Sequence, residues 1–419
     1  MMEHVLCTHI RGHLDTHRIL TPFNHGFRSK HSCETQLLLT THDLLTERDK
    51  GKRVDVIILD FSKAFDTVPH KRLLGKLEHY GIEGETLNWI TNFLSGRKQT
   101  VVVDGEHSKE ADVLSGVPQG TVPGPLLFLL HINDLPSVID PKTIIRLFAD
   151  DCLLYQVIES AEDEQQLQKD LDALDVWANN WGMSFNTKKC YTMPVDRNKS
   201  QTPHVYSLNG TALGSVTSEK YLGVLISQNM SWSPHISSVS TKANQKLGFL
   251  KRNLKGSPTD IKKLAYISIV RSSLEYASVI WDPHLAKDIN QLEGVQRKAA
   301  RWIQGDHQRT SSVSNMLKSL QLDTLEERRR ACRLAFMYKI LREDVAVSPS
   351  DMYIVRNPRA ARGLCTQDKL IVPRCHTTEL QKHFVARTVP EWNRLLQSTT
   401  SADSVQSFKG RLAGAVRHP

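Results

Sequence analysis

The chain has 419 residues, 40% hydrophobic and 24% charged, which excludes a disordered tail, a disulfide-stapled miniprotein and a collagen-like fibre. Its length favours two or three domains. The net charge of +9 is uneven, because residues 1–230 hold 23 Lys+Arg against 29 Asp+Glu, whereas residues 231–419 hold 31 against 16. A basic half of this size can attract a polyanion such as nucleic acid, although a solvated basic surface explains the charge equally well.

Nothing in the sequence indicates a membrane or a secretory route. No stretch approaches the roughly 20 apolar residues that span a bilayer, and the first twenty residues lack an apolar signal core. The seven cysteines are scattered along the chain and odd in number, which favours a reducing compartment. We therefore expect an intracellular protein with no membrane partner. Cys365, Cys375 and His376 lie near one another, but their spacing is unlike that of zinc ligands.

The first half of the chain predicts short elements of both kinds. Residues 54–60 (VDVIILD) predict a buried strand that ends in an acid, and a helix is expected over His70–His79 after Pro69. Glycines and prolines crowd residues 116–125 and predict a loop, which leads into an apolar, helical run over Leu126–Leu135.

Residues 143–157 predict two apolar strands joined by a tight turn at Ala149-Asp150. A helix is expected next, because apolar residues then recur at spacings of three and four. These residues are Leu167, Leu171, Leu174, Trp177 and Trp181. Strands are expected to return at Cys190–Pro194 and Tyr221–Ser227.

Beyond about residue 235 the pattern is mainly helical and basic. One expected apolar face consists of Ile261, Leu264, Ile267, Val270, Leu274, Ala277 and Trp281. A second consists of Ile289, Leu292, Val295, Ala299 and Ile303. The domain boundary is therefore expected between Ser227 and Ser240.

Three carboxylates in the first half are hard to explain structurally. Asp60 ends an apolar strand, and Asp150 and Asp151 lie at the tip of an apolar hairpin. Crowding carboxylates beside buried strands is costly unless a cation neutralises them, and Mg²⁺ prefers such oxygen ligands. Two such ions can serve phosphoryl transfer. An isolated Asp-Asp pair is more typical of a solvated turn. Three carboxylates at strand ends, with a glycine-rich loop between them in sequence, shift the balance toward a metal site, so spacing alone leaves both interpretations open.

Three strings stand out in the first half of the chain: LDFSKAFDTVPH (59–70), SGVPQGTVPGPLLFLLHINDL (115–135) and FADD (148–151). In sequence, order and spacing they resemble signature blocks of the reverse transcriptases of non-LTR (LINE) retrotransposons of the jockey-like group. Further similar strings are HGFRSKHSCETQL (25–37), WGMSFNTKKC (181–190), YLGVLI (221–226), LEYASVIWDPH (274–284) and parts of residues 372–412. The similarity thus covers nearly the whole chain.

The resemblance implies a catalytic triad and a metal site. Asp60 and Asp150 would be the main ligands of two Mg²⁺ ions, which Mn²⁺ can replace, with Asp151 completing the triad and the carbonyl of Phe61 adding a ligand. Lys189 matches a lysine that neutralises or protonates the leaving pyrophosphate, and the neighbouring Lys188 is the alternative.

The resemblance also implies contacts to substrates. Phe65 occupies the place of a steric gate that excludes a ribose 2′-hydroxyl, although a core aromatic is the alternative interpretation. Gln119 would lie against the templating base pair and the incoming nucleotide. Arg28 would contact nucleic acid from the fingers, with an exposed salt bridge as the alternative. Thr121 and Pro123 depart from the usual serine and leucine, and Pro123 is expected to alter the loop.

The architecture implied is α+β, a right-hand polymerase. Residues 1–230 would form partial fingers and a palm with an antiparallel sheet, and residues 231–419 a mostly helical, basic thumb and C-terminal region. The finger block that usually precedes the GFR string and an endonuclease domain are missing, so an N-terminally truncated copy is expected.

The implied activity is RNA-directed DNA polymerisation by two-Mg²⁺ nucleotidyl transfer, with an RNA template, a DNA primer and dNTPs as partners. Two other classes remain: a catalytically inactive copy that only binds nucleic acid, and a palm that serves as a scaffold. The expected location is the cytoplasm and nucleus, as for retroelement ribonucleoproteins, although no targeting signal is seen.

Overall fold

The computed structural model describes residues 1–197, 204–306, 308, 310–358 and 369–417. The chain forms two compact units: the first is Met1–Gln36 with Gly51–Thr217, and the second is Leu37–Lys50 with Ser218–Pro419. Helix α2 (Cys33–Asp49) therefore contributes to both units. The expected division at residue 230 into fingers with palm and thumb remains a prediction about function.

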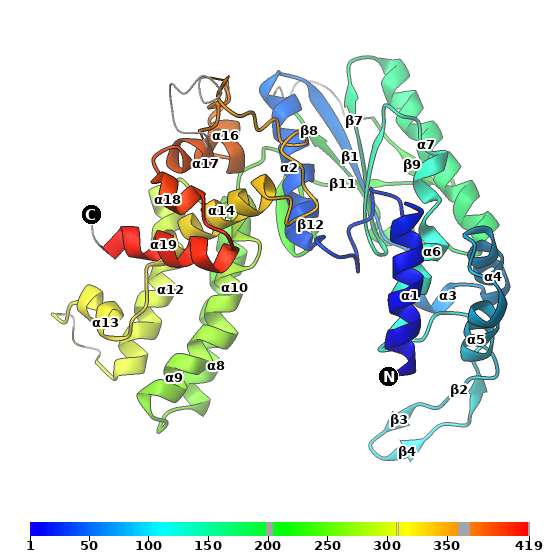
Figure 1. Cartoon of the computed structure of the whole chain (residues 1–419), viewed down its shortest axis with the longest axis horizontal. Coiled ribbons are helices and arrows are strands. Elements are labelled where there is room, and N and C mark those ends of the chain that lie inside the picture. Colours follow the sequence, from blue (N-terminus) through cyan, green and yellow to red (C-terminus); the bar gives the residue numbers. More distant parts are fainter. Residues whose placement is uncertain (198–203, 307, 309, 359–368, 418–419) are drawn as a thin grey trace. The chain divides into compact units, whose positions relative to one another are not determined.

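A five-stranded sheet organises the first unit (Figure 1). In spatial order its strands are β11 (Gly214–Ser215), β8 (Tyr191–Val195), β1 (Arg53–Leu59), β7 (Asp151–Ile158) and β6 (Ile144–Phe148). All neighbours are antiparallel except β11 and β8. The expected α+β class with an antiparallel sheet is confirmed, as are the strand before Asp60, the strand at Cys190–Pro194 and the hairpin that turns at Ala149-Asp150.

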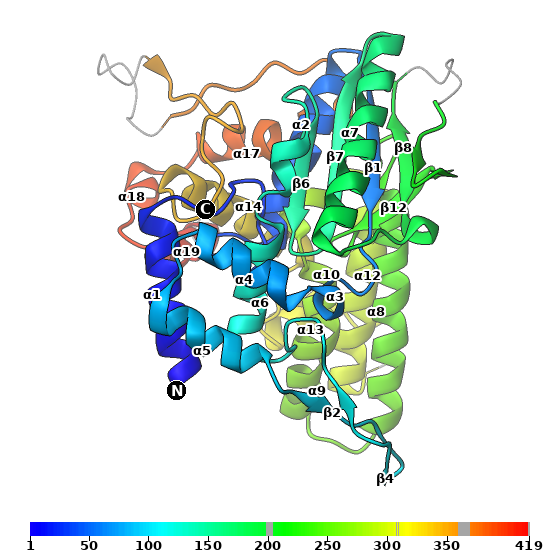
Figure 2. The ribbon, with the colours of Figure 1, turned by 90° about the vertical axis from the view of Figure 1, so that its right-hand side faces the viewer.

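In the view of Figure 1 the labelled helices of the first unit lie beside this sheet and below it, and Figure 2 shows them from a second side. They are α1 (Met2–Thr16), α3 (Ala64–Thr67), α4 (His70–His79), α5 (Gly84–Leu94), α6 (Pro123–Ile132), η1 (Leu135–Val138), α7 (Ala161–Trp181) and η2 (Thr187–Lys189). Nine of the ten residues of α6 are buried, which explains its unbroken apolar sequence. Helix α7 starts with a capping box at Ser160 and ends at Gly182 in the left-handed conformation.

One hydrophobic core joins the sheet to α6 and α7. It includes Ile57 and Leu59 of β1, Leu154 of β7, Leu127 of α6 and Leu171 of α7, each at most 2% exposed. The remaining strands of the first unit form small two-stranded pieces. These are β2 (Lys98–Gln99) with β5 (Ala111–Asp112), β3 (Val102–Val103) with β4 (Glu106–His107), and β9 (Ser207–Leu208) with β10 (Thr211–Ala212).

The second unit is mainly helical, as the sequence predicts. After β12 (Ser218–Tyr221) and β13 (Val224–Ser227) come α8 (Ser233–Asn253), α9 (Thr259–Ala265), η3 (Tyr266–Arg271), α10 (Ser272–Glu275), α11 (Ser278–Trp281), α12 (Ala286–Gln304) and α13 (Val313–Ser319). Then follow α14 (Leu325–Leu341), α16 (Thr378–Gln381), α17 (Phe384–Trp392), α18 (Gln397–Thr400) and α19 (Val405–Arg417). Among the described helices, none is long and apolar enough to cross a membrane.

Two expectations for the second unit are wrong in detail. The strand expected over Tyr221–Ser227 is a hairpin, because Leu222 takes a positive φ of 45° and the chain turns there. The apolar face expected from Ile261 to Trp281 is also not continuous. A π-helical segment, η3, shifts the register, so Leu264 is 61% exposed whereas Val270 is fully buried.

Two buried histidines make the second unit sensitive to acid. His42 and His383 stack with ring centroids 6.0 Å apart, and Thr41 Oγ1 lies 3.1 Å from His383 Nε2. Burial, with a smaller contribution from His42, lowers the pKa of His383 to about 3. Burial also lowers the pKa of His42, which Asp43 partly opposes. Both rings are therefore neutral in the fold at pH 7.

This arrangement should stabilise the fold fully above the unfolded pKa of about 6.5, and the contribution should be lost as the pH falls toward 3. The unfolding free energy of the parent chain should therefore be lower at pH 5 than at pH 6.5. We expect this difference to be about 2 kcal/mol smaller in His383→Gln. Urea unfolding at both pH values measures this drop. The exposed His107 provides the control, since His107→Gln should leave the drop unchanged. An equal drop in all three proteins would contradict the assignment.

Candidate active site

The three carboxylates singled out in the sequence meet at one edge of the sheet. Strands β1 and β7 are antiparallel with Leu59 opposite Cys152, so the next position in this register places Asp60 opposite Asp151. Asp150 lies in the tight turn between β6 and β7, whose last pair is Phe148 with Asp151. Residues 90 positions apart in sequence are thus brought together by strand pairing.

The turn that carries Asp150 is held from one side by residues 23–26. His25 N donates to Leu147 O (2.9 Å) and Leu147 N to Phe23 O (2.9 Å), which extends the sheet beyond β6. Asn24 Oδ1 accepts hydrogen bonds from the backbone nitrogens of Ala149 (3.1 Å) and Gly26 (2.9 Å). Ala149 itself has a φ of 54°, an unfavourable value for a residue with a side chain. The surrounding contacts therefore fix the position of Asp150.

Gly26 allows this close approach. A Cβ at residue 26 would overlap the backbone nitrogen of Ala149 and lie 3.0 Å from its Cα. We expect Gly26→Ala to displace the turn, lowering unfolding free energy by about 1–3 kcal/mol and reducing any catalysis that depends on Asp150. Thermal unfolding and an activity assay measure the two effects.

Gly12 in α1 offers a matched control, because nothing lies within 4 Å of the Cβ it would gain. Gly12→Ala should be neutral or stabilising by up to about 1 kcal/mol, since alanine favours a helix. Equal behaviour of the two variants would show that the contact of Gly26 with Ala149 does not hold the turn.

Burial and neighbouring negative charges raise the pKa values of two acids of the site. Burial raises the pKa of Asp151 to about 6, with further contributions from the charges of Asp150 and Asp60. Burial also raises the pKa of Asp150, to which Asp60 adds. The side chain of Asp151 keeps surface accessible to solvent, so a ligand can reach it. The site thus holds excess negative charge, which is favourable only when a cation is close.

Lys189 supplies one such cation. Its Nζ lies 3.5 Å from Asp60 Oδ2, on a side chain that is 66% exposed. The neighbouring Lys188 also lies in η2, and its backbone carbonyl accepts a hydrogen bond from Tyr191. The ion pair with Asp60 supports Lys189 as the lysine of the site, and the choice between the two lysines remains a prediction.

Phe61 follows Asp60 and pairs with Phe185 in an isolated antiparallel bridge. The hydrogen bonds of this bridge are Asn186 N to Asp60 O and Ser62 N to Ser184 O, both 2.8 Å. In this pattern the carbonyl of Phe61 points away from the paired segment. It is therefore not consumed by the bridge, which is compatible with the role predicted for it.

Hydrogen bonds join the two segments that carry Phe65 and Gln119. Val117 N donates to Phe65 O (2.8 Å), and Gln119 Nε2 donates to Asp66 Oδ1 (2.9 Å). Gly116 has a φ of 91°, and a Cβ there would lie 2.8 Å from Asp66 O. The half-buried ring of Phe65 stacks on Phe128 with centroids 4.2 Å apart. Phe65 is therefore partly a core aromatic and partly accessible.

Pro123 lies at the end of this loop, and its effect on the loop relative to the family pattern remains a prediction. It is the first residue of α6, a position where proline costs no hydrogen bond. Thr121 keeps the hydroxyl that the family pattern places there: its Oγ1 donates to Pro118 O (2.6 Å) and accepts from Gly124 N (3.3 Å).

Arg28 is half-buried rather than extended into solvent. Its Nη1 donates to the carbonyls of Thr21 (2.5 Å) and Asn24 (3.3 Å), and burial lowers its pKa, with Asp15 opposing. An exposed salt bridge, the alternative interpretation, is therefore not what the structure has. Contact with nucleic acid remains a prediction for this residue.

The oxygen atoms of the site decide whether a metal ion can bind there. Among the described residues, no three His, Cys, Asp or Glu side chains are already grouped to hold a metal ion. Asp60, Asp150 and Asp151 nevertheless provide oxygen donors at one edge, with raised pKa values for the latter two that a divalent cation would reverse. The donor set suits a hard cation.

Of the three residues considered above as zinc ligands, Cys365 lies outside the described residues.

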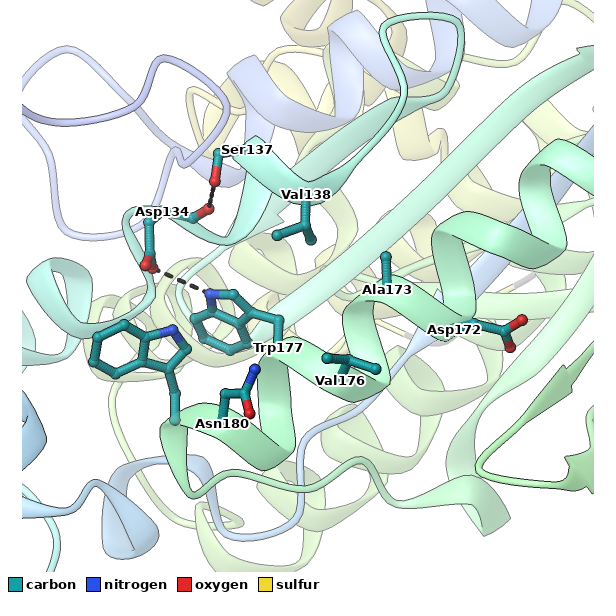
Figure 3. Close-up of a pocket in the computed structure, with 9 residues that line it drawn as sticks. Asp134, Ser137, Val138, Asp172, Ala173, Val176, Trp177 and Asn180 are labelled. Atoms are coloured by element: carbon teal, nitrogen blue, oxygen red, sulfur yellow. Dashed lines mark hydrogen bonds between the residues drawn. The ribbon is translucent and has the colours of Figure 1, made fainter.

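A separate pocket of about 520 Å³ lies along α7 (Figure 3). Trp177 Nε1 donates to Asp134 Oδ1 (3.2 Å), which also accepts from Lys76 Nζ (2.5 Å). The Lys76 ammonium lies 3.6 Å from the centroid of Trp181. These contacts fasten α4 to α7, and none of the predicted site residues lines this pocket.

Comparison with known proteins agrees with this geometry. The family model described as "Reverse transcriptase (RNA-dependent DNA polymerase)" matches residues 2–226, more than half of the chain. The chain belongs to the reverse transcriptase family. The match spans every acid of the site and the loop of residues 115–125.

The chain is similar to polymerases of jockey-like non-LTR retrotransposons. It is 28% identical over 330 residues to the "RNA-directed DNA polymerase from mobile element jockey" of Drosophila funebris, covering 76% of this chain and 36% of that protein. It is 27% identical over 317 residues to the "Probable RNA-directed DNA polymerase from transposon X-element" of Drosophila melanogaster, covering 73% and 34%. The chain thus spans about a third of the length of these curated relatives.

A solved structure of apo telomerase from Candida tropicalis aligns with a TM-score of 0.45 at 10% identity, covering 84% of this chain and 55% of that chain. A likeness of this strength does not by itself establish a shared fold.

Two residues that position the turn of Asp150, Asn24 and Gly26, were not singled out from the sequence. Asn24 lies just before the family-like string of residues 25–37, and Gly26 lies inside it. An asparagine followed two residues later by glycine was the available signal, and it is too common to be specific.

Proposed function

We propose that this chain is an RNA-directed DNA polymerase. It would extend a DNA primer with dNTPs and copy an RNA template. The observation that carries the proposal is the convergence of Asp60, Asp150 and Asp151 at one sheet edge, beside the ammonium of Lys189. Acids brought together from two strands and left with raised pKa values favour metal-dependent phosphoryl transfer over a structural role.

In the proposed reaction the primer 3′-hydroxyl attacks the α-phosphorus of a dNTP, a new P–O bond forms and the bond to pyrophosphate breaks. Asp60, Asp150, Asp151 and the Phe61 carbonyl would hold two Mg²⁺ ions, which when bound activate the attacking oxygen and stabilise the leaving group. Lys189 neutralises or protonates the pyrophosphate. Phe65, seated on Phe128, excludes a ribose 2′-hydroxyl.

The loop of residues 115–121 completes the nucleotide site. Its hydrogen bonds to Phe65 and Asp66 support a fixed position for Gln119 against the templating pair. The first unit would then be the fingers and palm. The second unit, which carries most of the basic excess, would grip the phosphate backbone as the thumb.

Primer extension on poly(rA)/oligo(dT) tests the proposal. We expect the purified chain to extend the primer with Mg²⁺ and to stop when EDTA removes the metal, with Mn²⁺ able to substitute. Binding of the same primer–template should weaken steeply with salt. Salt-sensitive binding without extension would overturn the polymerase proposal in favour of a copy that only binds nucleic acid.

A further inference from the structure

Helix α1 carries a pair of histidines that the proposed function does not use. His13 and His17 are one turn apart at the end of this helix, with ring centroids 4.5 Å apart and ring planes inclined by 43°. Side chains four residues apart lie on the same face of a helix. His13 is half-buried and His17 is exposed, so a small ligand can reach both rings.

A backbone carbonyl orients each ring. His13 Nε2 lies 2.8 Å from Tyr80 O, and His17 Nδ1 lies 2.9 Å from His13 O. A carbonyl oxygen can only accept a hydrogen bond, so both of these ring nitrogens carry a hydrogen. In a neutral imidazole the other nitrogen then has a lone pair and no hydrogen. His13 Nδ1 and His17 Nε2 are therefore the two atoms that can bind a cation.

Metal-binding histidines show this pattern. A histidine that binds a metal almost always donates from its second ring nitrogen to a carboxylate, a carbonyl or water, which fixes the tautomer and makes the binding nitrogen more basic. Metal–nitrogen bonds of about 2.0–2.1 Å place the centroids of two rings on one ion roughly 4.5–5.2 Å apart, depending on the angle at the ion. The distance of 4.5 Å between the two rings lies at the lower end of this range.

The ring of His13 is positioned by a neighbouring segment. The last turn of α1 lies beside the turn between α4 and α5, where Tyr80 is followed by Gly81 (Figure 2). A Cβ at residue 81 would lie 3.3 Å from His13 Nε2, so the glycine leaves room for the ring. The attraction of histidines to the negative end of a helix explains their place near the end of α1. It does not explain the contact of His13 with the turn after α4.

We propose that His13 Nδ1 and His17 Nε2 bind one divalent transition-metal ion of the kind that prefers imidazole ligands, such as Zn²⁺. The two rings are the protein ligands, since no three His, Cys, Asp or Glu side chains are grouped among the described residues, and water would complete the coordination. The ion would stiffen the last turn of α1 at its contact with Tyr80. The site shares no residue with the catalytic acids, so the proposal is independent of the proposed polymerase activity.

Equilibrium dialysis against ZnCl₂ in excess MgCl₂ tests the site, because Mg²⁺ competes for carboxylates but not for imidazoles. We expect the parent chain to bind one Zn²⁺ more than His13→Gln, His17→Gln or the double variant. Because both rings bind the same ion, either single change should weaken its binding about tenfold or more, and the second change should add little. Zinc bound by cysteines is the same in all four proteins and cancels in the comparison.

His4→Gln is the matched control. His4 is exposed on the same helix, and at about 100° per residue it lies half a turn around the helix from His13. Its replacement should therefore leave the ion bound. Glutamine at position 13 can still donate to Tyr80 O, so His13→Gln should keep the melting temperature of the parent chain in the absence of metal. This measurement separates loss of a ligand from loss of the fold.

Modification by diethyl pyrocarbonate, located by mass spectrometry, gives a second measurement. Zn²⁺ should protect His13 and His17 of the parent chain and leave His4 reactive. Equal zinc binding by the parent chain and the double variant would overturn the proposal, as would additive effects of the two single changes or unprotected rings at both positions. Primer extension plays no part in these measurements, so failure of the metal site and failure of the polymerase proposal are distinguishable.

Discussion

Asp150→Asn is expected to reduce primer extension by roughly a thousandfold or more, while the fold stays intact. Asparagine has the shape of aspartate but lacks its charge, so it removes one ligand of the proposed metal site. Stability should be unchanged or slightly higher, because burial and the charge of Asp60 already raise the pKa of Asp150. The carboxylate is therefore unfavourable in the fold at neutral pH, and its loss relieves repulsion.

Primer extension and thermal unfolding of the same preparations measure the two halves of this prediction. The control is Asp104→Asn, at the exposed tip of the β3–β4 hairpin, which should leave both quantities unchanged. Near-normal extension by Asp150→Asn would reject the site. If Asp150→Asn lost activity and its melting temperature also fell, Asp150 would instead have a structural role.

Local sequence patterns single out the acids of the site, whereas only the resemblance to reverse transcriptases predicts that they act together. An apolar strand ending in Asp60 and a hairpin tipped by Asp150 each follow from short-range periodicity. Once the two are antiparallel neighbours, the register brings the acids to one edge. No such rule links residues 23–26 to Ala149, because that contact depends on the absence of a side chain at Gly26 and on the tertiary fold.

The wrong predictions in the second unit also concern features that local sequence patterns do not encode. The face from Ile261 to Trp281 fits a regular helical repeat, but the π-helical η3 adds a residue to the turn and shifts which side chains are buried. Leu222 adopts a positive φ that its sequence does not favour, so the hairpin there was not predicted. Likewise, the joining of Leu37–Lys50 to the second unit depends on contacts far apart in sequence.

A buried charge cluster in the second unit gives the largest expected effect on stability. Asp282 accepts hydrogen bonds from Arg329 Nε (2.7 Å) and Arg333 Nε (2.8 Å), and lies 3.3 Å from Arg387 Nη2. Arg329 and Arg333 are only 1% and 2% exposed. Two further nitrogens of Arg329 are buried without a hydrogen-bond partner among the described residues. Arg333 also donates from Nη2 to Glu391 Oε1 (2.9 Å), whereas Asp282 is the carboxylate paired with the buried Arg329.

Asp282→Ala should therefore lower the unfolding free energy by about 3–5 kcal/mol, because it leaves buried cations unpaired. For a unit of this size the melting temperature should fall by roughly 10 °C. Thermal and denaturant unfolding measure the loss, and the exposed Asp403 provides the control, since Asp403→Asn should change stability by less than about 0.5 kcal/mol.

The double variant Asp282→Ala/Arg329→Met distinguishes unpaired charge from lost packing. If the cost comes from a buried guanidinium without its partner, replacing Arg329 by an apolar side chain of similar length should recover part of the stability. Additive losses from the two changes would show that Asp282 stabilises the unit by other contacts. Partial recovery would establish that the buried guanidinium of Arg329 depends on Asp282 for its charge pairing.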